Sequence, residues 1–264
     1  MSALVEIIDL AKAYRGIHAV DGVSFAVQGG SITGLIGPNG SGKSTTIDCI
    51  SGFQRLDAGR VMLDGRDITG LRPQAIARAG LVRTFQTVRV YDHFSVIDNL
   101  LTVAEPFGQL AWFDVLLRTP KYRAIRRAAE ERALTLIDLV GLARLADMPA
   151  TILSYGQKKL LALAAALMSN PKLVVLDEPV AGVNPTRINE VADILRRANE
   201  AGATFLIVEH NVEFISALCH HVIVFDQGRK LVEGPPAAVH GDPRVLDAYL
   251  GVGDVAPVHL PEAS

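Results

Sequence analysis

The sequence predicts an α/β fold organised around a phosphate-binding loop, and three observations support this prediction. An apolar run at residues 32–36 leads into residues 37–45, which follow the pattern G-x-x-x-x-G-K-S, and residues 46–50 can continue as a helix. A second apolar run ends in two adjacent carboxylates, Asp177 and Glu178. Between these parts the composition shifts toward helix. We therefore expect a P-loop NTPase core with an antiparallel β subdomain and a helical subdomain.

The loop at residues 37–45 has the chemistry of a triphosphate cradle. Its glycines let successive backbone N–H groups converge on an anion, and the helix N-terminus adds partial positive charge. Lys43 would reach the β- and γ-phosphates, and the Ser44 hydroxyl would ligate Mg²⁺. A glycine-rich turn that merely carries a lysine is the alternative, which the complete pattern and its flanks disfavour. The predicted nucleotide contacts in the loop are Gly37, Pro38, Asn39, Gly40, Ser41, Gly42, Lys43, Ser44 and Thr45.

Composition and charge argue against several other classes of protein. The 264 residues suffice for one large α/β domain or two small ones. Lys and Arg number 26 against 28 Asp and Glu, a net charge of −2, so nucleic-acid binding is not expected. Cys49 and Cys219 have no C-x-x-C spacing, which predicts reduced cytosolic thiols.

No signal peptide is expected at the N-terminus, where an acidic residue follows at position 6. The longest apolar run, residues 160–168, is less than half of the about 20 residues that a membrane-spanning helix needs. If the protein works at a membrane, another subunit must supply the spanning part.

Local patterns predict the order of elements. Residues 4–10 and 23–27 read as half-buried strands, and Tyr14 in the turn between them would either stack on a nucleotide base or simply pack. Asp64 and Gly65 indicate a hairpin. The predicted division is a nucleotide-binding core with the antiparallel β subdomain at residues 1–94 and 170–250, a helical subdomain at 95–169, and a loose tail at 251–264.

Polar residues at strand ends are further site candidates. Gln86 would reach a metal ion or an attacking water, or it is an exposed loop amide, and spacing alone does not choose. Asp177 would hold the Mg²⁺ shell, and Glu178 would accept a proton from the attacking water. A histidine such as His210 at a strand end is usually structural, but the shared sheet edge supports a γ-phosphate contact. Asn184 is expected to cap the helix that follows it.

The helical stretch carries two more expectations. Residues 121–140 predict a helix whose buried face comprises Ala128, Leu134, Leu136, Ile137 and Val140. The connection at residues 107–117 is unusually apolar, and we expect it to pack on its own helices; the alternative is partial exposure for a partner.

A second helix start suited to anions follows at residues 153–157, which we call the signature. Ser154 is a natural helix cap, and Gly156 would let a phosphate approach the backbone. Two copies packed head to tail could therefore hold a triphosphate between the phosphate loop of one and the Ser154 end of the other.

These motifs, in this order, resemble the ATP-binding subunits of ABC transporters, over residues 4–250. The resemblance implies that Tyr14 stacks on adenine, that Gln86 links nucleotide to permease, that His210 contacts the γ-phosphate, and that Glu178 is the general base. It further implies Mg²⁺ ligation by Ser44, Gln86 and Asp177. Its predicted contacts to ATP across a dimer are Ser154, Tyr155, Gly156 and Gln157.

Two departures from the family pattern point to a subgroup. Tyr155 replaces the first glycine of the signature, and Asn184 stands where the loop usually ends in aspartate. Both variants are similar to those of the branched-chain amino-acid uptake group, as are residues 82–86, 96–100, 181–185, 208–211 and 248–251.

The resemblance implies an ATPase that uses ATP and Mg²⁺ to power uptake of branched-chain or related amino acids. Its partners would be membrane permease subunits, a second cassette in a homo- or heterodimer, and indirectly a solute-binding protein. It would lie peripherally at the cytoplasmic side of the inner membrane. The alternatives are a lipid or lipopolysaccharide exporter cassette, a soluble ATPase acting on nucleic acid or ribosomes, and a nucleotide-binding regulator without turnover.

Overall fold

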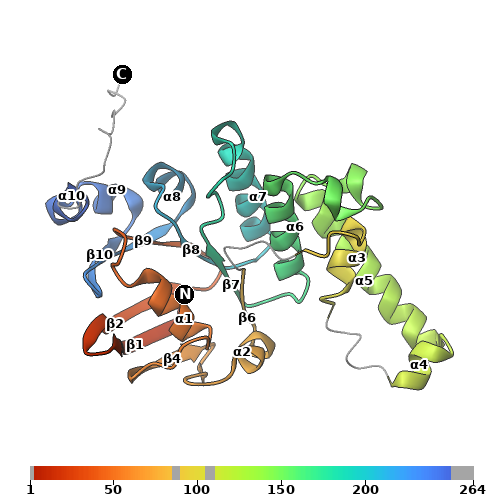
Figure 1. Cartoon of the computed structure of the whole chain (residues 1–264), viewed down its shortest axis with the longest axis horizontal. Helices are drawn as coiled ribbons and strands as arrows, with labels where there is room; N and C mark the ends of the chain where they lie inside the picture. The colour runs from red at the N-terminus through yellow and green to blue at the C-terminus, as the bar shows by residue number, and fades with distance from the viewer. Residues whose placement is uncertain (1–2, 85–89, 105–110, 251–264) are drawn as a thin grey trace. The chain divides into compact units, whose positions relative to one another are not determined.

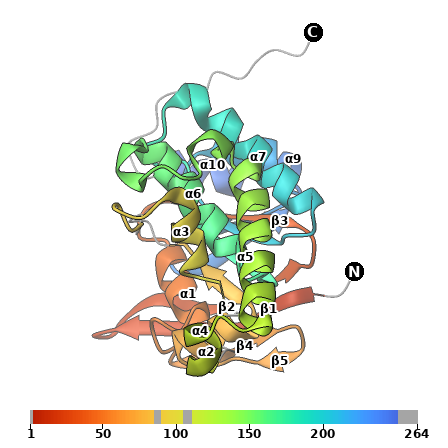
Figure 2. The same cartoon turned by 90° about the vertical axis from the view of Figure 1, so that its right-hand side faces the viewer.

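The computed structural model describes residues 3–84, 90–104 and 111–250 (Figures 1 and 2). The chain forms two compact units. The first comprises Met1–Ala75 and Leu206–Ser264, and the second comprises Ile76–Phe205. The subdomain boundaries predicted at residues 95 and 169 stay a prediction.

The first unit contains a four-stranded antiparallel sheet in the order β2-β1-β4-β5. Alternating apolar residues such as Val5 and Ile7 bury one face of β1, as a period of two requires. Asp64 and Gly65 both have positive φ, which is the two-residue hairpin predicted from their sequence. The strands are β1 Ala3–Tyr14, β2 Ile17–Gln28, β4 Ala58–Leu63 and β5 Arg66–Asp67.

Four further strands in the order β10-β9-β3-β8 belong to the first unit, except for Phe205 at the start of β8, which falls in the second. Strand β3 is parallel to β9 and buried along its whole length, as expected for a central strand. The strands are β3 Ile32–Ile36, β8 Phe205–Val208, β9 His221–Asp226 and β10 Arg229–Gly234. The helices are α1 Lys43–Ile50, α8 Val212–Leu218, α9 Pro236–His240 and α10 Pro243–Leu250, and α2 Pro73–Ala79 crosses the boundary between the units.

The second unit combines a parallel strand pair with a group of helices. Strand β6 pairs with β7 in parallel, and α5 packs against α3, α6 and α7. Ser95 caps α3 by accepting a hydrogen bond from the Asp98 N–H. The elements are β6 Leu81–Arg83, β7 Leu173–Asp177, α3 Val96–Leu101, α4 Trp112–Leu116, α5 Pro120–Leu139, α6 Tyr155–Leu167 and α7 Ile188–Glu200. Short 3-10 helices occupy Ala143–Leu145, Ala150–Ile152 and Pro185–Arg187.

Helix α5 forms where predicted, but its buried face was predicted wrongly at two positions. Ala128 and Leu134 are exposed, Leu134 by 49%. An α-helix turns by about 100° per residue, and this rotation places Ala128 on one flank and Leu134 on the other flank of the arc that faces the neighbouring helices. That arc comprises Ala129, Ala133, Leu136, Ile137 and Val140.

The expected packing of the apolar connection is also wrong for the part that is described. Trp112, Phe113 and Leu116 are exposed at α4, which lies at the end of α5 in both views. Within the described ranges, no helix is both long enough and apolar enough to cross a bilayer.

Candidate nucleotide-binding site

The phosphate loop joins β3 to α1 in the first unit, as the sequence predicts. Gly42 stands at the N-cap of α1 in a left-handed conformation, and no side chain caps the helix. The N-cap glycine therefore offers no side-chain acceptor to the first N–H groups of α1, and helix N-termini of this kind bind phosphate. Asn39, Gly40 and Ser44 are exposed, so this end of the helix is accessible.

Two glycines of the loop are required by close backbone contacts. A Cβ atom on Gly37 would lie 2.2 Å from the carbonyl oxygen of Phe225, and one on Gly42 would lie 2.4 Å from that of Ala19. Both residues also have positive φ. The glycine spacing in the sequence thus reflects how closely β9 and β2 approach the loop.

Lys43 lies along its own loop. Its ammonium group donates to the carbonyl oxygens of Gly37 at 2.7 Å and Pro38 at 2.9 Å, and it lies 3.4 Å from Ser41 Oγ. The cation is therefore already held at the rim of the cradle, where a phosphate oxygen can exchange for these carbonyls.

His210 lies at the same sheet edge as the loop. The Glu209 N–H donates to the Leu35 carbonyl at 3.4 Å, which brings the end of β8 beside the end of β3. The Glu209 side chain is buried and accepts from the backbone N–H groups of His210 and Asn211. The His210 side chain is 65% exposed, so a buried carboxylate fixes the backbone while the imidazole projects outward.

Tyr14 ends β1 and is 42% exposed. Lys12 approaches its ring at 5.4 Å and forms an ion pair with Asp57 at 2.8 Å. The hydrogen bond from Lys12 lowers the pKa of Asp57 and raises the pKa of Lys12. An accessible aromatic ring is thus held beside a cation in the same unit as the phosphate loop. Its assignment to adenine stays a prediction.

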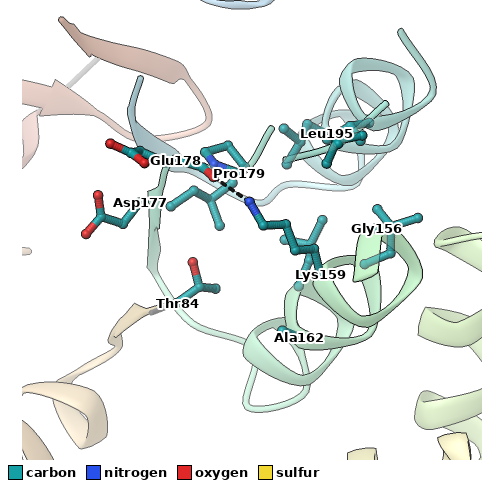
Figure 3. A pocket seen from close by; sticks show the side chains of 13 residues that line it. Thr84, Gly156, Lys159, Ala162, Asp177, Glu178, Pro179 and Leu195 are labelled. Atoms are coloured by element: carbon teal, nitrogen blue, oxygen red, sulfur yellow. Dashed lines mark hydrogen bonds between the residues drawn. The ribbon is translucent and has the colours of Figure 1, made fainter. Parts of the chain in front are cut away.

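In the second unit, Asp177 ends β7 and pairs with Arg83 of β6 (Figure 3 shows Asp177 beside Thr84). Arg83 Nη2 lies 2.8 Å from Asp177 Oδ2, with side-chain exposures of 10% and 11%. The strand register explains the pair: Arg83 faces Val175, which lies two residues before Asp177 on the same side of β7. No motif in the sequence points to Arg83, because its relation to Asp177 depends on strand pairing.

Glu178 follows in a strained conformation that side chains of α6 support. Its φ is +50°, a region that residues with a side chain rarely occupy. Lys159 Nζ donates to the carbonyl oxygens of Glu178 at 2.8 Å and Ala181 at 2.6 Å. In Figure 3 the carboxylates of Asp177 and Glu178 point to the side opposite Lys159. The pocket beneath them is only about 40 Å³, too small for a nucleotide.

The signature forms a capped helix start, as predicted. Ser154 Oγ accepts from the Gln157 N–H at 3.3 Å, and Gln157 Oε1 accepts from the Ser154 N–H at 2.9 Å. Tyr155 is 51% exposed and packs beside Gly182, where an added Cβ would lie 3.3 Å from the ring. The tyrosine that replaces the usual glycine therefore contacts the loop that follows Glu178.

The remaining predicted residues have mixed outcomes. Asn184 caps the 3-10 helix at Pro185–Arg187 by accepting from the Thr186 N–H at 3.0 Å. Gln86 lies outside the described residues. Tyr249 of α10, to which the sequence analysis assigned no role, has a buried hydroxyl near the Gly37 backbone, and burial raises the pKa of Tyr249 to about 12.

Two of the predicted magnesium ligands lie in the described residues, and each has the chemistry that this ion prefers. Ser44 of the first unit offers a hydroxyl, and Asp177 of the second unit offers a carboxylate, which here pairs with Arg83; both are hard oxygen ligands. Among the described residues, no three His, Cys, Asp or Glu side chains cluster as a metal cage. Such a cage is not needed, because Mg²⁺ at nucleotide sites takes few protein ligands and keeps phosphate and water oxygens.

Comparison with known proteins identifies the family to which the chain belongs. The family model for ABC transporters matches residues 20–181, and the model for branched-chain amino acid ATP-binding cassette transporters matches residues 229–255. The chain is 35% identical to the high-affinity branched-chain amino acid transport ATP-binding protein BraF of Pseudomonas aeruginosa, over 94% of this chain and 98% of that protein. It is 38% identical to a probable branched-chain amino acid transport ATP-binding protein, LivG, of Archaeoglobus fulgidus, over 93% and 95%.

Solved structures agree. The crystal structure of the ADP conformation of MJ1267, an ATP-binding cassette of an ABC transporter, matches with a TM-score of 0.82 at 35% identity, over 95% of this chain and all of that one. A nucleotide-free ATP-binding cassette from an ABC transporter matches with a TM-score of 0.79 at 34% identity, over 96% of this chain and 100% of that one. Sequence motifs, fold and relatives thus coincide, and the chain belongs to the ABC transporter family as one of its ATP-binding, ATP-hydrolysing subunits.

Proposed function

We propose that this subunit powers uptake of branched-chain or related amino acids through a separate membrane permease. The observation that carries the cargo assignment is that the second family model matches residues 229–255, outside the region matched by the general ABC model. The relatives named for branched-chain amino acid transport match over nearly their whole length. The family-model match and the named relatives together favour amino-acid uptake over lipid export.

In this proposal the backbone N–H groups of the phosphate loop bind the triphosphate. The side chains of Lys43 and His210 contact the γ-phosphate and stabilise its charge. Glu178 accepts the proton of the attacking water. Ser44, Gln86 and Asp177 would hold Mg²⁺, which neutralises charge on the phosphates when bound. Tyr14 stacks on adenine.

Two copies of the chain, or this chain and a related cassette, would close over ATP with the signature of one against the phosphate loop of the other. The surface at the signature supports this arrangement. Ser154 is exposed, and the apolar side chains of Met148, Ile152 and Tyr155 beside it are 50%, 55% and 51% exposed. Exposed apolar groups around a helix start fit a partner that covers them.

The test of hydrolysis is Glu178→Gln, which keeps the shape of the side chain and removes the base. We expect ATP binding to remain, ATP-bound dimers to accumulate, and turnover to fall by at least about 100-fold. Phosphate release and size-exclusion chromatography with ATP measure both effects. Undiminished turnover would remove Glu178 from the mechanism.

The test of assembly is Ser154→Arg, which places a bulky cation at the helix start. ATP binding to the monomer should persist, while ATP-driven association should be lost. Affinity purification of the chain from its native membrane tests the cargo: a permease should co-purify, and a branched-chain amino acid should accelerate hydrolysis in the assembled complex. Acceleration by a lipid instead would contradict the cargo assignment.

A further inference from the structure

Helix α4 in the second unit has an inverted pattern of burial. Its one charged residue, Asp114, is only 7% exposed, whereas Trp112 is 77% exposed and Leu116 and Leu117 are each 71% exposed. Scattered exposed apolar residues are normal, but a cluster beside a buried carboxylate is informative. We call this cluster the apolar tip; it comprises Trp112, Phe113, Val115, Leu116 and Leu117.

Hydrogen bonds account for this inversion. Asp114 Oδ2 accepts from the Ala111 N–H at 3.2 Å, and Oδ1 accepts from the Thr119 hydroxyl at 2.9 Å. Thr119 Oγ1 in turn accepts from the Tyr122 N–H at 3.3 Å and so caps α5. The carboxylate therefore anchors α4 to the start of α5 and turns the apolar side chains outward.

Basic side chains flank the apolar tip. Within residues 111–127 five cations accompany the single carboxylate of Asp114, a local charge of +4 in a chain whose net charge is −2. Arg126 pairs with Glu130 at 2.7 Å, but Arg118, Arg123 and Arg127 have no carboxylate partner within the described part of the chain. We call these exposed residues the cationic rim: Arg118, Lys121, Arg123, Arg126 and Arg127.

We propose that the apolar tip and the cationic rim bind the headgroup interface of an anionic lipid bilayer. Tryptophan is enriched at that depth of a membrane, and short apolar side chains beside it gain burial among the acyl chains. Each basic residue near an anionic surface contributes about 1 kcal/mol. The rest of the chain carries the opposite net charge, so the same surface would orient the protein with this end toward the lipid.

This inference rests on the proposed role at a membrane, and it names the part of the cassette that touches lipid. A protein partner could cover the apolar tip alone. The positive charges of the arginines along α5 that lack a carboxylate partner among the described residues complement the negative charges of lipid phosphate headgroups. This match favours a bilayer over a protein partner.

Trp112 is the only tryptophan in the chain, so its fluorescence reports directly on this surface. The full chain is mixed with phosphatidylcholine vesicles with or without phosphatidylglycerol. We expect a blue shift with the anionic vesicles, quenching by brominated lipid, and weaker binding as salt is raised, because screening reduces the charge attraction.

Two double variants separate the contribution of the apolar tip from that of the cationic rim. Leu116→Ser with Leu117→Ser, and separately Arg123→Glu with Arg127→Glu, should each weaken vesicle binding at least about 10-fold. The matched controls are Ile17→Ser, at a residue 75% exposed in the first unit, and Arg66→Glu, both of which should leave binding unchanged.

ATP hydrolysis and ATP-driven association are measured on the same proteins and should not change, because these residues lie outside the proposed nucleotide site. Trp112 emission that is unaltered by anionic vesicles would overturn the inference while leaving the proposed transport function intact. If, in addition, the Leu116 and Leu117 variant no longer co-purified with a permease, the surface would be a protein contact. If the native chain bound anionic vesicles but did not hydrolyse ATP, the transport proposal would be contradicted and the lipid-binding inference would stand.

Discussion

Lys159 Nζ donates to the backbone carbonyl of Glu178 at 2.8 Å, so the helix that begins at the signature also holds the loop of the proposed general base. A second bond from the same ammonium group to Ala181, at 2.6 Å, fixes the other side of this loop. A left-handed conformation such as that of Glu178 costs about 1–2 kcal/mol, and these charge-assisted bonds offset that cost. A movement of the signature helix would thereby change the position of Glu178.

We predict that Lys159→Met lowers kcat for ATP hydrolysis by about 10- to 100-fold, since each lost bond to a charged donor is worth about 1.5–3 kcal/mol. KM should change little, because Lys159 lies in the unit that does not carry the phosphate loop. Steady-state phosphate release measures both constants. Lys159→Arg should restore most of the rate, and Lys158→Met, which removes an exposed pair with Asp92, is the matched control. An unchanged kcat in Lys159→Met would exclude this positioning role.

The buried pair of Arg83 and Asp177 predicts a large effect on stability. Arg83→Met leaves a mostly buried carboxylate without its cation, which should cost about 3 kcal/mol of unfolding free energy. Urea denaturation measures the change. Arg126→Met removes the exposed pair with Glu130 and should cost less than about 0.5 kcal/mol. Equal effects in the two variants would show that Asp177 does not depend on Arg83.

Two glycines of the phosphate loop provide a matched comparison. Gly37→Ala would place a Cβ 2.2 Å from the Phe225 carbonyl, so the loop must shift and ATP binding should be lost. Gly40→Ala has nothing within 4 Å and should cost only the strain of positive φ, about 1 kcal/mol. Titration with a fluorescent ATP analogue, with circular dichroism to verify folding, tests the pair. Equal loss of affinity in both would contradict a steric role for Gly37.

The two cysteines predict a loss of stability at high pH. Burial raises the pKa of Cys49 to about 11 and that of Cys219 to about 12. Because a thiol in the unfolded chain titrates near about 8.5, stability is complete below that pH and is lost as pH rises toward the folded values. Urea denaturation at neutral and alkaline pH should show a loss of a few kcal/mol.

Replacing both cysteines by alanine should reduce this pH dependence, although other groups continue to titrate. At neutral pH both thiols should react slowly with Ellman's reagent while the protein is folded. Rapid reaction of either thiol in the folded protein would contradict its burial.

Neighbouring residues were enough to predict the parts of this protein whose chemistry is local. The spacing of Gly37, Gly42 and Lys43 defines a phosphate loop because backbone turns and the helix start follow from adjacent residues. The caps at Ser95, Ser154 and Asn184 were predictable for the same reason, since each accepts a hydrogen bond from two or three residues ahead.

Contacts between residues that are distant in the sequence, in contrast, depend on how the elements pack. Arg83 reaches Asp177 because β6 and β7 pair in one register, and Lys159 reaches Glu178 because α6 packs beside the end of β7. The apolar connection shows the same limit. Composition predicted burial for Trp112, but the hydrogen bonds of Asp114 to Ala111 and Thr119 turned the helix the other way. Burial depends on which face a fold covers, and periodicity in one segment does not contain that information.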